Sequence, residues 1–443
     1  MSLRARWVLP IDAPPIENGF VRIDGRRIAE VGRATPSRTD RAEDLGDAIL
    51  LPGLINAHAH LELSCYAGLL PPGPLWDWLA GLIALRRQPG AAARERQAIV
   101  DGANESLRAG VTCVADISRG GDTAAALAGH PIRKVCFVEL ISGASTPPSD
   151  PDELRERLDR ARRAADERTL VGVSPHSFYN VSWDDLRRMA ALAAEEDLPV
   201  TMHVAETRDE LDWLESGSGA VAGFLARFGK PGAGGGVRGA PSELLHRCGL
   251  SRLRPLLAHV NYVSDVEIEA LARMRCPVVF CPRAHAFFGH APHRWRDLLA
   301  SGVNVCLGTD GLASNRSLSM LDEIRALYVS AAAHSRWPPL DKGGVESSSS
   351  TRPDSDPAAA TADALAPLLF EMATRRAAAA LGLSDVCGTL TPGKAADLIA
   401  ASPPRPAADP WSALLDPNCR VRDVWIDGRR VVGTRRSDGW VDG

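Results

Sequence analysis

No CxxC pair occurs among the nine scattered cysteines of this 443-residue chain. An odd, scattered set argues against a disulfide framework and fits a reducing compartment. A formal net charge of -4 supplies no basic field for nucleic acid or an anionic membrane, so neither partner is expected. No apolar run approaches membrane-spanning length, and no secretory signal is recognisable at the N-terminus. We therefore expect a soluble cytoplasmic protein.

Between residues 50 and 310, short apolar segments rich in β-branched residues alternate with helical segments rich in Ala, Leu, Arg and Glu. This alternation predicts buried parallel strands of the α/β class, and eight such units favour a closed (β/α)8 TIM barrel. An open doubly wound sheet is the alternative, but the GxGxxG phosphate loop it predicts is absent after the first strand. The expected strands cover 49–60, 111–117, 134–141, 170–177, 198–206, 255–262, 277–282 and 303–310.

The two ends of the chain share the sequence IDGRR, within 20–32 and within 424–434. Each copy predicts a strand, a tight Asp-Gly turn and a second strand. We interpret them as two hairpins of one small β-domain built from residues 1–50 and 385–443, with the barrel over 51–384. Coincidence between two unrelated hairpins is the alternative. Surface loops are expected at the glycine-rich segment 229–242, which could border the pocket, and at the Ser/Pro-rich segment 341–361.

Two histidines, His58 and His60, end the first expected strand. Residues two apart on a strand face the same side, so both rings point together into the C-terminal mouth of a barrel, where barrel active sites lie. Alone, such a pair could be two polar residues at a strand end. His203, His259 and Asp310 also stand at the ends of strands five, six and eight, where packing favours apolar residues. Converging imidazoles and a carboxylate predict a divalent-metal site.

Six motifs follow one another in the order found in the amidohydrolase superfamily, which the chain resembles over nearly its whole length: PGLINAHAHLELS, VSPHSFYNVS, MHVAET, AHVNY, LGTDGLASN and GTLTPGKAADLIA. The resemblance implies a (β/α)8 barrel with a β-sandwich formed by both termini. It also implies one metal ion bound by His58, His60, His203 and Asp310. Binuclear members usually carry a carbamylated lysine on strand four, and LVGVSPHS has no lysine. We expect a mononuclear site that holds zinc, with iron and manganese as alternatives.

The expected chemistry is attack by water on an electrophilic carbon, since a divalent ion lowers the pKa of its water from about 15.7 toward about 7. Asp310 is suited to accept the water proton, and His259 to stabilise the tetrahedral state. Glu206 can turn inward only if its strand ends near Ala205. HxxE at this place resembles the ring deaminases of the superfamily, which implies that Glu206 shuttles protons. The alternative is that it orients His203.

Substrate contacts are predicted mainly from the same resemblance. His176 matches a substrate-contacting histidine of the methylthioadenosine/S-adenosylhomocysteine deaminases, and Glu105 has the spacing of their ribose-binding glutamate or else lies on a solvated helix face. The segment after strand seven departs from their commoner CPxSN pattern and places Arg283 and His285 where substrate would pass, or else forms an ordered loop. NAHAHLELS is similar to aminodeoxyfutalosine deaminases, which puts Glu62 on a loop at the pocket.

Three functions remain open at this point. The first is hydrolytic deamination of an amino-substituted heterocycle, such as an aminopurine nucleoside, which needs Glu206. The second is hydrolysis of a chloro- or amino-triazine, a cyclic amide or a similar bond at the same site; GTDGLAS (308–314) is common to both classes. The third, a non-catalytic binding protein, is disfavoured by the complete ligand set. The expected partner is a small-molecule substrate, and homo-oligomerisation stays open.

Overall fold

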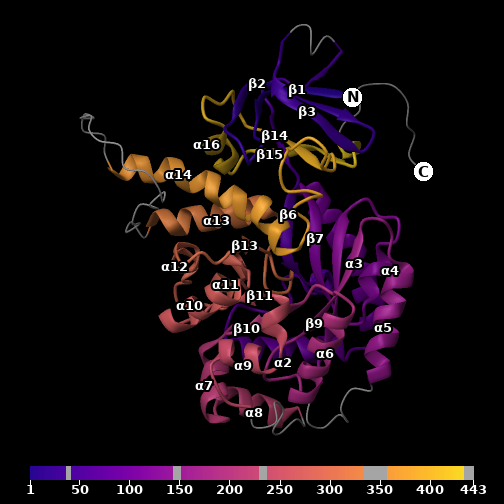
Figure 1. Cartoon of the computed structure of the whole chain (residues 1–443), viewed down its shortest axis with the longest axis vertical. Helices are drawn as coiled ribbons and strands as arrows, with labels where there is room; N and C mark the ends of the chain where they lie inside the picture. The colour runs from indigo at the N-terminus through magenta and orange to yellow at the C-terminus, as the bar shows by residue number, and fades with distance from the viewer. Residues whose placement is uncertain (36–40, 143–150, 229–236, 334–356, 434–443) are drawn as a thin grey trace.

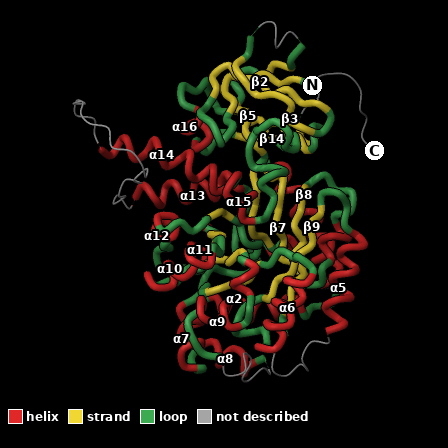
Figure 2. Tube along the Cα trace, in the orientation of Figure 1, coloured by secondary structure: helices red, strands yellow, loops and turns green. Residues whose placement is uncertain are grey.

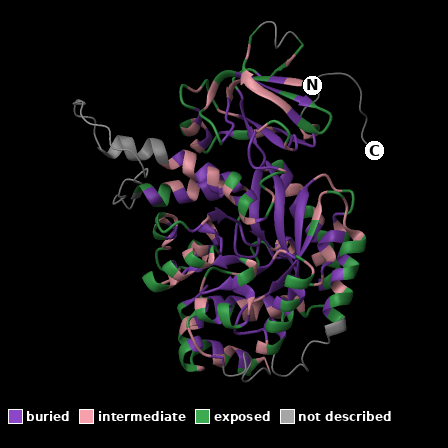
Figure 3. Cartoon of the chain, viewed as in Figure 1, coloured by how far each residue is buried: buried purple, intermediate pink, exposed green. Residues whose placement is uncertain are grey.

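A computed structural model describes residues 1–35, 41–142, 151–228, 237–333 and 357–433 (Figure 1). A β-sheet lies at one end of the long axis, and a larger α/β part with helices around its strands fills the other (Figure 2). The strands of the α/β part are mostly buried, whereas the helices around them carry many exposed residues (Figure 3). Within the described ranges, no helix combines the length and the apolar character that a bilayer span requires.

The sheet joins both ends of the chain in the order β16-β15-β14-β5-β1-β2-β3, with β4 beside β1. At its centre β5 pairs parallel with β1 and antiparallel with β14. Both IDGRR hairpins therefore lie in one sheet. The strands are β1 (Ser2–Val8), β2 (Ile16–Asp24), β3 (Arg27–Arg33), β4 (Glu43–Asp44), β5 (Ile49–Pro52), β14 (Leu398–Ser402), β15 (Arg420–Ile426) and β16 (Arg429–Val432).

The two IDGRR copies form different turns. In the C-terminal copy Asp427 and Gly428 connect the strands with φ of 48° and 73°, as a type I′ hairpin turn requires. In the N-terminal copy the connecting residues are Gly25 and Arg26, one position later, and the pairing register shifts near Ile23. The predicted Asp-Gly turn is correct for the second hairpin and one residue out for the first.

The α/β part holds two four-stranded parallel sheets, β6-β7-β8-β9 and β10-β11-β12-β13. Single parallel bridges link them at both edges, from Ala59 to Asp310 and from Val173 to Val200. These eight strands overlap the eight predicted segments. They are β6 (Leu54–Ala59), β7 (Val111–Ser118), β8 (Arg133–Leu140), β9 (Thr169–Pro175), β10 (Thr201–Val204), β11 (Leu256–His259), β12 (Val278–Phe280) and β13 (Val305–Leu307).

Helices connect most of these strands, and α6 (Trp183–Glu195) shows how the sequence starts one. The Ser182 hydroxyl accepts a hydrogen bond from the backbone N–H of Asp185, which satisfies a donor that has no partner within the helix. One face of α6 is buried at helical spacing, through Leu186, Met189, Ala190 and Ala193. The other connecting helices include α3 (Ala91–Arg108), α4 (Asp122–Ala126), α5 (Pro151–Ala164), α10 (Asp265–Met274) and α12 (Trp295–Ala300).

The predicted single strand over 49–60 is wrong, because the chain forms β5 in the terminal sheet and β6 in the α/β part. Gly53 separates them. A Cβ at this glycine would lie 2.0 Å from the Thr112 hydroxyl oxygen, so only glycine fits. An apolar run does not reveal such a change of sheet, since both strands are buried on both faces.

The predicted loops lie partly outside the described residues, which omit 229–236 and 334–356. The end of the first, 237–242, leads into α9 (Pro241–Arg247). The prediction of a loop to residue 361 is wrong at its end, because α14 (Pro357–Met372) already begins at Pro357.

An ion cluster at Arg133, the first residue of β8, connects the terminal sheet to the α/β part. Its Nε donates to Asp397 at 3.0 Å, and its terminal nitrogen donates to Asp427 at 3.1 Å. Arg168 and Arg26 also contact Asp427. The Arg133 and Asp397 side chains are only 9% and 1% exposed. A buried charge without an opposite charge beside it destabilises the folded state, so this ion pair offsets the cost of burying both groups.

We expect Arg133→Met to lower the free energy of unfolding by about 3–5 kcal/mol, because it leaves the buried Asp397 carboxylate without its cationic partner. Urea unfolding followed by circular dichroism measures the change. Arg4→Met is the matched control, since Arg4 pairs with Asp44 on the surface at 47% exposure and such pairs contribute about 0–1 kcal/mol. Equal losses in the two variants would contradict a structural role for the buried cluster.

Candidate metal centre and active site

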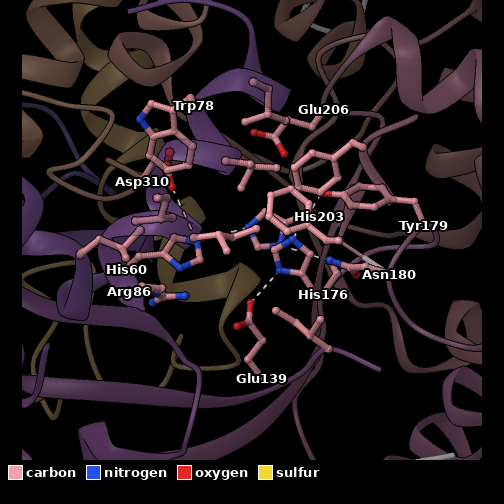
Figure 4. Close-up of a pocket in the computed structure, with 18 of the residues that line it drawn as sticks. His60, Trp78, Arg86, Glu139, His176, Tyr179, Asn180, His203, Glu206 and Asp310 are labelled. Atoms are coloured by element: carbon pink, nitrogen blue, oxygen red, sulfur yellow. Dashed lines mark hydrogen bonds and ion pairs between the residues drawn. The ribbon is translucent and has the colours of Figure 1, made fainter. Parts of the chain in front are cut away.

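Five predicted side chains meet at the C-terminal ends of the strands. His58 lies in β6, with His60 directly after it; His203 lies in β10, His259 ends β11, and Asp310 follows β13. The Asp310 Oδ1 atom is 3.8 Å from His58 Nε2 and 3.6 Å from His60 Nε2. The Nε2 atoms of His60 and His203 are 3.3 Å apart. Figure 4 shows His60, His203 and Asp310 facing one cavity.

The donor set of this cluster fits a divalent metal ion. His58 is fully buried, and neither ring nitrogen has a hydrogen-bond partner among the described residues. Burial and the neighbouring His203 hold the pKa of His58 well below its ordinary value, so the ring is neutral and keeps a lone pair for a metal. Ligand atoms of His58, His60 and Asp310 lie within 4.8 Å of one another, as do those of His58, His203 and His259. Imidazoles with one carboxylate are ligands for zinc and for several other divalent metals.

Neighbouring groups orient these ligands. The Nδ1–H of His203 donates to the carbonyl of His176 at 3.2 Å, which leaves Nε2 free to face the cluster. The Ser314 hydroxyl donates to Asp310 Oδ2 at 2.5 Å and leaves Oδ1 toward the histidines. Gly308 is required because a Cβ there would lie 2.9 Å from that of His58. The sequence LGTDGLAS thus contains Asp310 itself. It also contains Gly308, which allows the backbone to pass close to His58.

Four residues at this rim have left-handed backbone, although none is glycine: Ala205, His259, Val260 and Asp310, with φ of 51°, 73°, 49° and 60°. Such conformations cost on the order of 1–3 kcal/mol each and cluster at functional sites. At Ala205 the reversal ends β10 after Val204 and turns Glu206 toward the cavity. The inward position of Glu206 therefore follows from the backbone at Ala205.

Glu206 lies beside His259, with Oε1 3.7 Å from Nε2. Burial, together with the nearby Asp310 and Glu210 carboxylates, raises the pKa of Glu206 well above its ordinary value. A carboxyl whose pKa lies well above its ordinary value is more readily protonated, and a protonated carboxyl can act as a general acid. The alternative role of orienting His203 has no support in the described contacts, since the carbonyl of His176 already accepts from that ring.

Burial raises the pKa of Asp310 to about 6, and the hydrogen bonds from Ser314 and the Gly311 backbone oppose this rise. His259 and His203 are both shifted to lower pKa, mainly by burial. The uncharged imidazoles and the single carboxylate are therefore ready to bind a cation without first losing protons.

The rest of the cavity wall is largely apolar. The α2 helix (Leu75–Arg86) contributes Leu75, Trp78, Leu79, Leu82 and Ile83, and the α8 helix (Ala220–Arg227) contributes Phe224 and Leu225. Phe288 meets Trp78 edge to face with ring centroids 5.3 Å apart. A flat ring with an apolar substituent matches a cavity that has one polar end and one apolar wall.

His176 lines the cavity as predicted, and the structure adds a partner that sequence reasoning missed. The Nδ1–H of His176 donates to Glu139 at 2.7 Å, and its ring stacks on His203 with centroids 4.4 Å apart. Burial is the largest single influence and raises the pKa of Glu139. The contact with His176, together with His203 and Arg86, lowers this pKa by more in total, so the pKa of the Glu139 carboxyl lies below its ordinary value. The available signal was one carboxylate inside the apolar strand sequence KVCFVELI. Trp78, Arg86 and Tyr179 also line the cavity and had no comparable signal.

Four predicted substrate contacts are not among the described residues that line this cavity. Glu105 accepts from the backbone N–H of Leu318. Glu62 pairs with Arg86, which is itself a residue of the cavity wall. Arg283 donates to Ser317, and His285 donates to the Ala291 carbonyl. Their polar groups serve neighbouring protein atoms, and we propose no substrate role for them.

Substitution Glu139→Gln is expected to raise KM for the substrate, because the amide replaces the charged acceptor that fixes the His176 ring. The expected loss in kcat/KM is about 10-fold, since a hydrogen bond to a charged group contributes roughly 1.5–3 kcal/mol. Steady-state kinetics with metal analysis of the same sample measures it. Glu153→Gln on the exposed face of α5 is the control. Unchanged KM with bound metal retained would contradict a positioning role.

Comparisons with known proteins agree with this geometry. Residues 49–431 match the amidohydrolase family. The chain is 30% identical to the 5'-deoxyadenosine deaminase of Methanothermobacter thermautotrophicus over 411 residues, which cover 90% of this chain and 84% of that protein. It is 30% identical to the aminodeoxyfutalosine deaminase of Deinococcus radiodurans, with 70% and 76% covered. A solved adenosine deaminase from Xanthomonas campestris with bound zinc superposes with a TM-score of 0.77 at 26% identity, covering 98% and 92% of the two chains.

Proposed function

Because the chain belongs to the amidohydrolase family and to its metal-dependent deaminase branch, we propose that its substrate is an aminopurine nucleoside or a close analogue. The products are the oxo-heterocycle and ammonia. The observation that carries this proposal is Glu206, which faces the cavity 3.7 Å from His259 and beside the strand-end cluster. Relatives named as deaminases of adenosine derivatives support the substrate class.

The eight strands of the α/β part are proposed to form one closed (β/α)8 barrel. The bridges Ala59–Asp310 and Val173–Val200 support closure, because they connect the outer strands of the two sheets at both edges. The expected boundary at residue 51 is two residues too early, because β5 (Ile49–Pro52) pairs with β14 in the terminal sheet. We further propose that residues 53–384 are the barrel domain and that 1–52 with 385–443 form a β-sandwich domain. A cytoplasmic location, with a small molecule as the partner, completes the proposal.

We propose His58, His60, His203 and Asp310 as the ligands of one zinc ion. When bound, the ion supplies Lewis acidity toward the attacking water and toward the charge that develops during attack. Support comes from the neutral, unpartnered ring of His58 and from zinc in the Xanthomonas campestris structure. Iron and manganese fit the same donors.

The residues around the cluster account for the proton transfers. Asp310 Oδ1 accepts a proton from the water that attacks the carbon bearing the amino group. Glu206, protonated at rest, gives its proton to the adjacent ring nitrogen. His259 hydrogen-bonds the new oxygen substituent in the tetrahedral state. The Glu206 carboxylate then takes the proton of the new hydroxyl group and passes it to the amino group. The carbon–nitrogen bond breaks, ammonia leaves with both electrons of that bond, and the hydroxyl oxygen becomes the oxo group. The proton held by Asp310 returns to Glu206.

Removal of the metal is expected to abolish turnover. Dialysis against a chelator should reduce ammonia release to background, and stoichiometric zinc should restore it, because the cluster's neutral histidines need no rearrangement to bind. Elemental analysis before and after dialysis measures the metal. Activity that persists in protein proven free of metal would contradict the assigned centre.

The substrate proposal is tested with a panel of aminopurine nucleosides, aminopyrimidines, aminotriazines and chlorotriazines, scored for ammonia and for chloride. We expect ammonia from one or more aminopurine nucleosides with the highest kcat/KM. Chloride release from a chlorotriazine at a higher kcat/KM would favour the alternative hydrolase function. Metal-loaded protein that binds nucleosides without turnover would favour a binding protein.

A further inference from the structure

The segment after β12 carries three histidines: His285 in α11 (Pro282–Phe287), and His290 and His293 in the loop that follows this helix. Each ring has a protein partner rather than an open face. The Nε2–H of His285 donates to the Ala291 carbonyl at 2.9 Å, and His290 Nδ1 lies 3.4 Å from the Tyr262 hydroxyl. His293 differs from the other two, because its hydrogen-bond partner is the backbone carbonyl of His259, a residue of the candidate active site.

His293 donates its Nε2–H to the backbone carbonyl of His259 at 2.8 Å. Its ring stacks on Phe280, with centroids 3.9 Å apart and planes 20° apart. Phe280 ends β12, the strand next to β11, so the His293 ring is held against the sheet while it contacts the end of β11. Since a carbonyl can only accept, the proton must be on Nε2. The other nitrogen, Nδ1, is buried and has no partner within the described residues.

The carbonyl that His293 contacts belongs to a strained segment. His259 has φ of 73° and Val260 has φ of 49°. Left-handed backbone is rare for any residue with a Cβ and is a clear outlier for β-branched valine. The reversal at the end of β11 turns the His259 carbonyl toward His293 and leaves the imidazole facing Glu206 at 3.7 Å.

The peptide direction at His259 thus decides where its ring lies. A right-handed or extended φ at this residue would carry both the carbonyl and the imidazole to new positions. The backbone N–H of Val260 bonds to the Val204 carbonyl, which fixes the next peptide on the other side. Within the described structure, His293 is the side chain that hydrogen-bonds the His259 carbonyl.

We propose that His293 is a positioning residue: it holds the reversed backbone at His259 and thereby aims the His259 imidazole at the reacting carbon. This inference rests on the proposed function, in which His259 stabilises the tetrahedral state. It assigns a role to a histidine that the sequence analysis did not single out, in the segment where only Arg283 and His285 were predicted as substrate contacts. The substrate itself does not need to touch His293.

The test compares His293→Leu and His293→Gln with the wild-type enzyme. A glutamine amide can place an N–H near the position of the imidazole Nε2–H, whereas leucine keeps the bulk and loses the donor. We expect the leucine variant to lose on the order of 100-fold in kcat, because a small misplacement of a group at the reacting centre has an effect of this size. KM and metal content should stay unchanged, and glutamine should restore most of the lost kcat.

His290→Leu is the matched control, since it removes a ring from the same loop that contacts Tyr262 and not His259. Its kcat should equal that of the wild type. An equal loss of kcat in His290→Leu and His293→Leu, or no rescue by glutamine, would show that the loop acts only through its overall fold and would overturn the proposal.

A crystal structure of His293→Leu separates this proposal from the proposed function. We expect the φ of His259 to leave the left-handed region and its ring to move away from Glu206. An unchanged His259 backbone would overturn the positioning role even if the enzyme is a deaminase. A displaced backbone in a protein whose wild type shows no deamination would sustain the positioning role and reject the proposed function alone.

Discussion

Substitution Asp310→Asn is expected to reduce kcat/KM for deamination by roughly 10²–10⁴-fold, since it removes the group assigned to accept the proton of the attacking water. The same change weakens metal binding, because the amide oxygen carries no negative charge for a cation. In the wild type, the Asp310 Oδ1 atom lies 3.8 Å and 3.6 Å from the Nε2 atoms of His58 and His60. Ammonia release at saturating metal separates the two effects. Excess zinc should restore occupancy but not turnover.

The α/β part should still fold in this variant. Asparagine has nearly the same shape, and with its oxygen toward the histidines its side-chain NH2 can donate to the Ser314 hydroxyl oxygen. Circular dichroism and thermal unfolding provide the check, and Asp265→Asn, at a side chain 84% exposed on α10, is the matched control for losing one carboxylate. Full activity of Asp310→Asn with bound metal would rule out its role as base.

Substitution Glu206→Gln is expected to stop deamination, again by on the order of 10²–10⁴-fold, while the metal stays bound. The amide cannot give a proton to the ring nitrogen and then transfer another to the leaving amine. Metal should be retained because His203 is oriented by the carbonyl of His176 and not by Glu206. Elemental analysis and ammonia release on one preparation test both parts.

Two results would count against this assignment. Loss of metal from Glu206→Gln would make Glu206 a supporting partner of the ligand set, and retention of turnover would remove it from the reaction. Glu215→Gln is the matched control, because Glu215 is an exposed carboxylate on α7 (Arg208–Ser216), the helix that follows Glu206. A chlorotriazine in the same assay asks whether a substrate that releases chloride also needs this carboxyl.

The strand-end cluster was predictable because it depends on simple periodicities. Residues two apart on a strand share a face, and the ends of parallel strands meet at one rim. This reasoning brings His58, His60 and Asp310 together without knowledge of any loop. It fails for Glu206, whose position depends on the left-handed backbone at Ala205, and no residue type announces that conformation.

The predicted contacts on helices and loops fared differently. Spacing from a glycine places Glu105 on α3 but does not say which way that helix turns its carboxylate, which accepts from Leu318. Arg283 and His285 lie on the short helix α11 (Pro282–Phe287), where Arg283 donates to Ser317 and His285 donates to the Ala291 carbonyl. Glu139 was not predicted, because a single carboxylate inside an apolar strand sequence does not reveal its partner. In the structure it accepts a hydrogen bond from His176.

The central position of β5 in the terminal sheet has a consequence for biosynthesis. On the ribosome, β1 to β5 emerge first, but β14, the partner of β5 on its other side, emerges only after the whole barrel sequence has been translated. Until then the nascent sheet carries an open edge along Ile49–Pro52, and unpaired strand edges promote association between chains. Newly made chains therefore need protection from one another until synthesis is nearly finished.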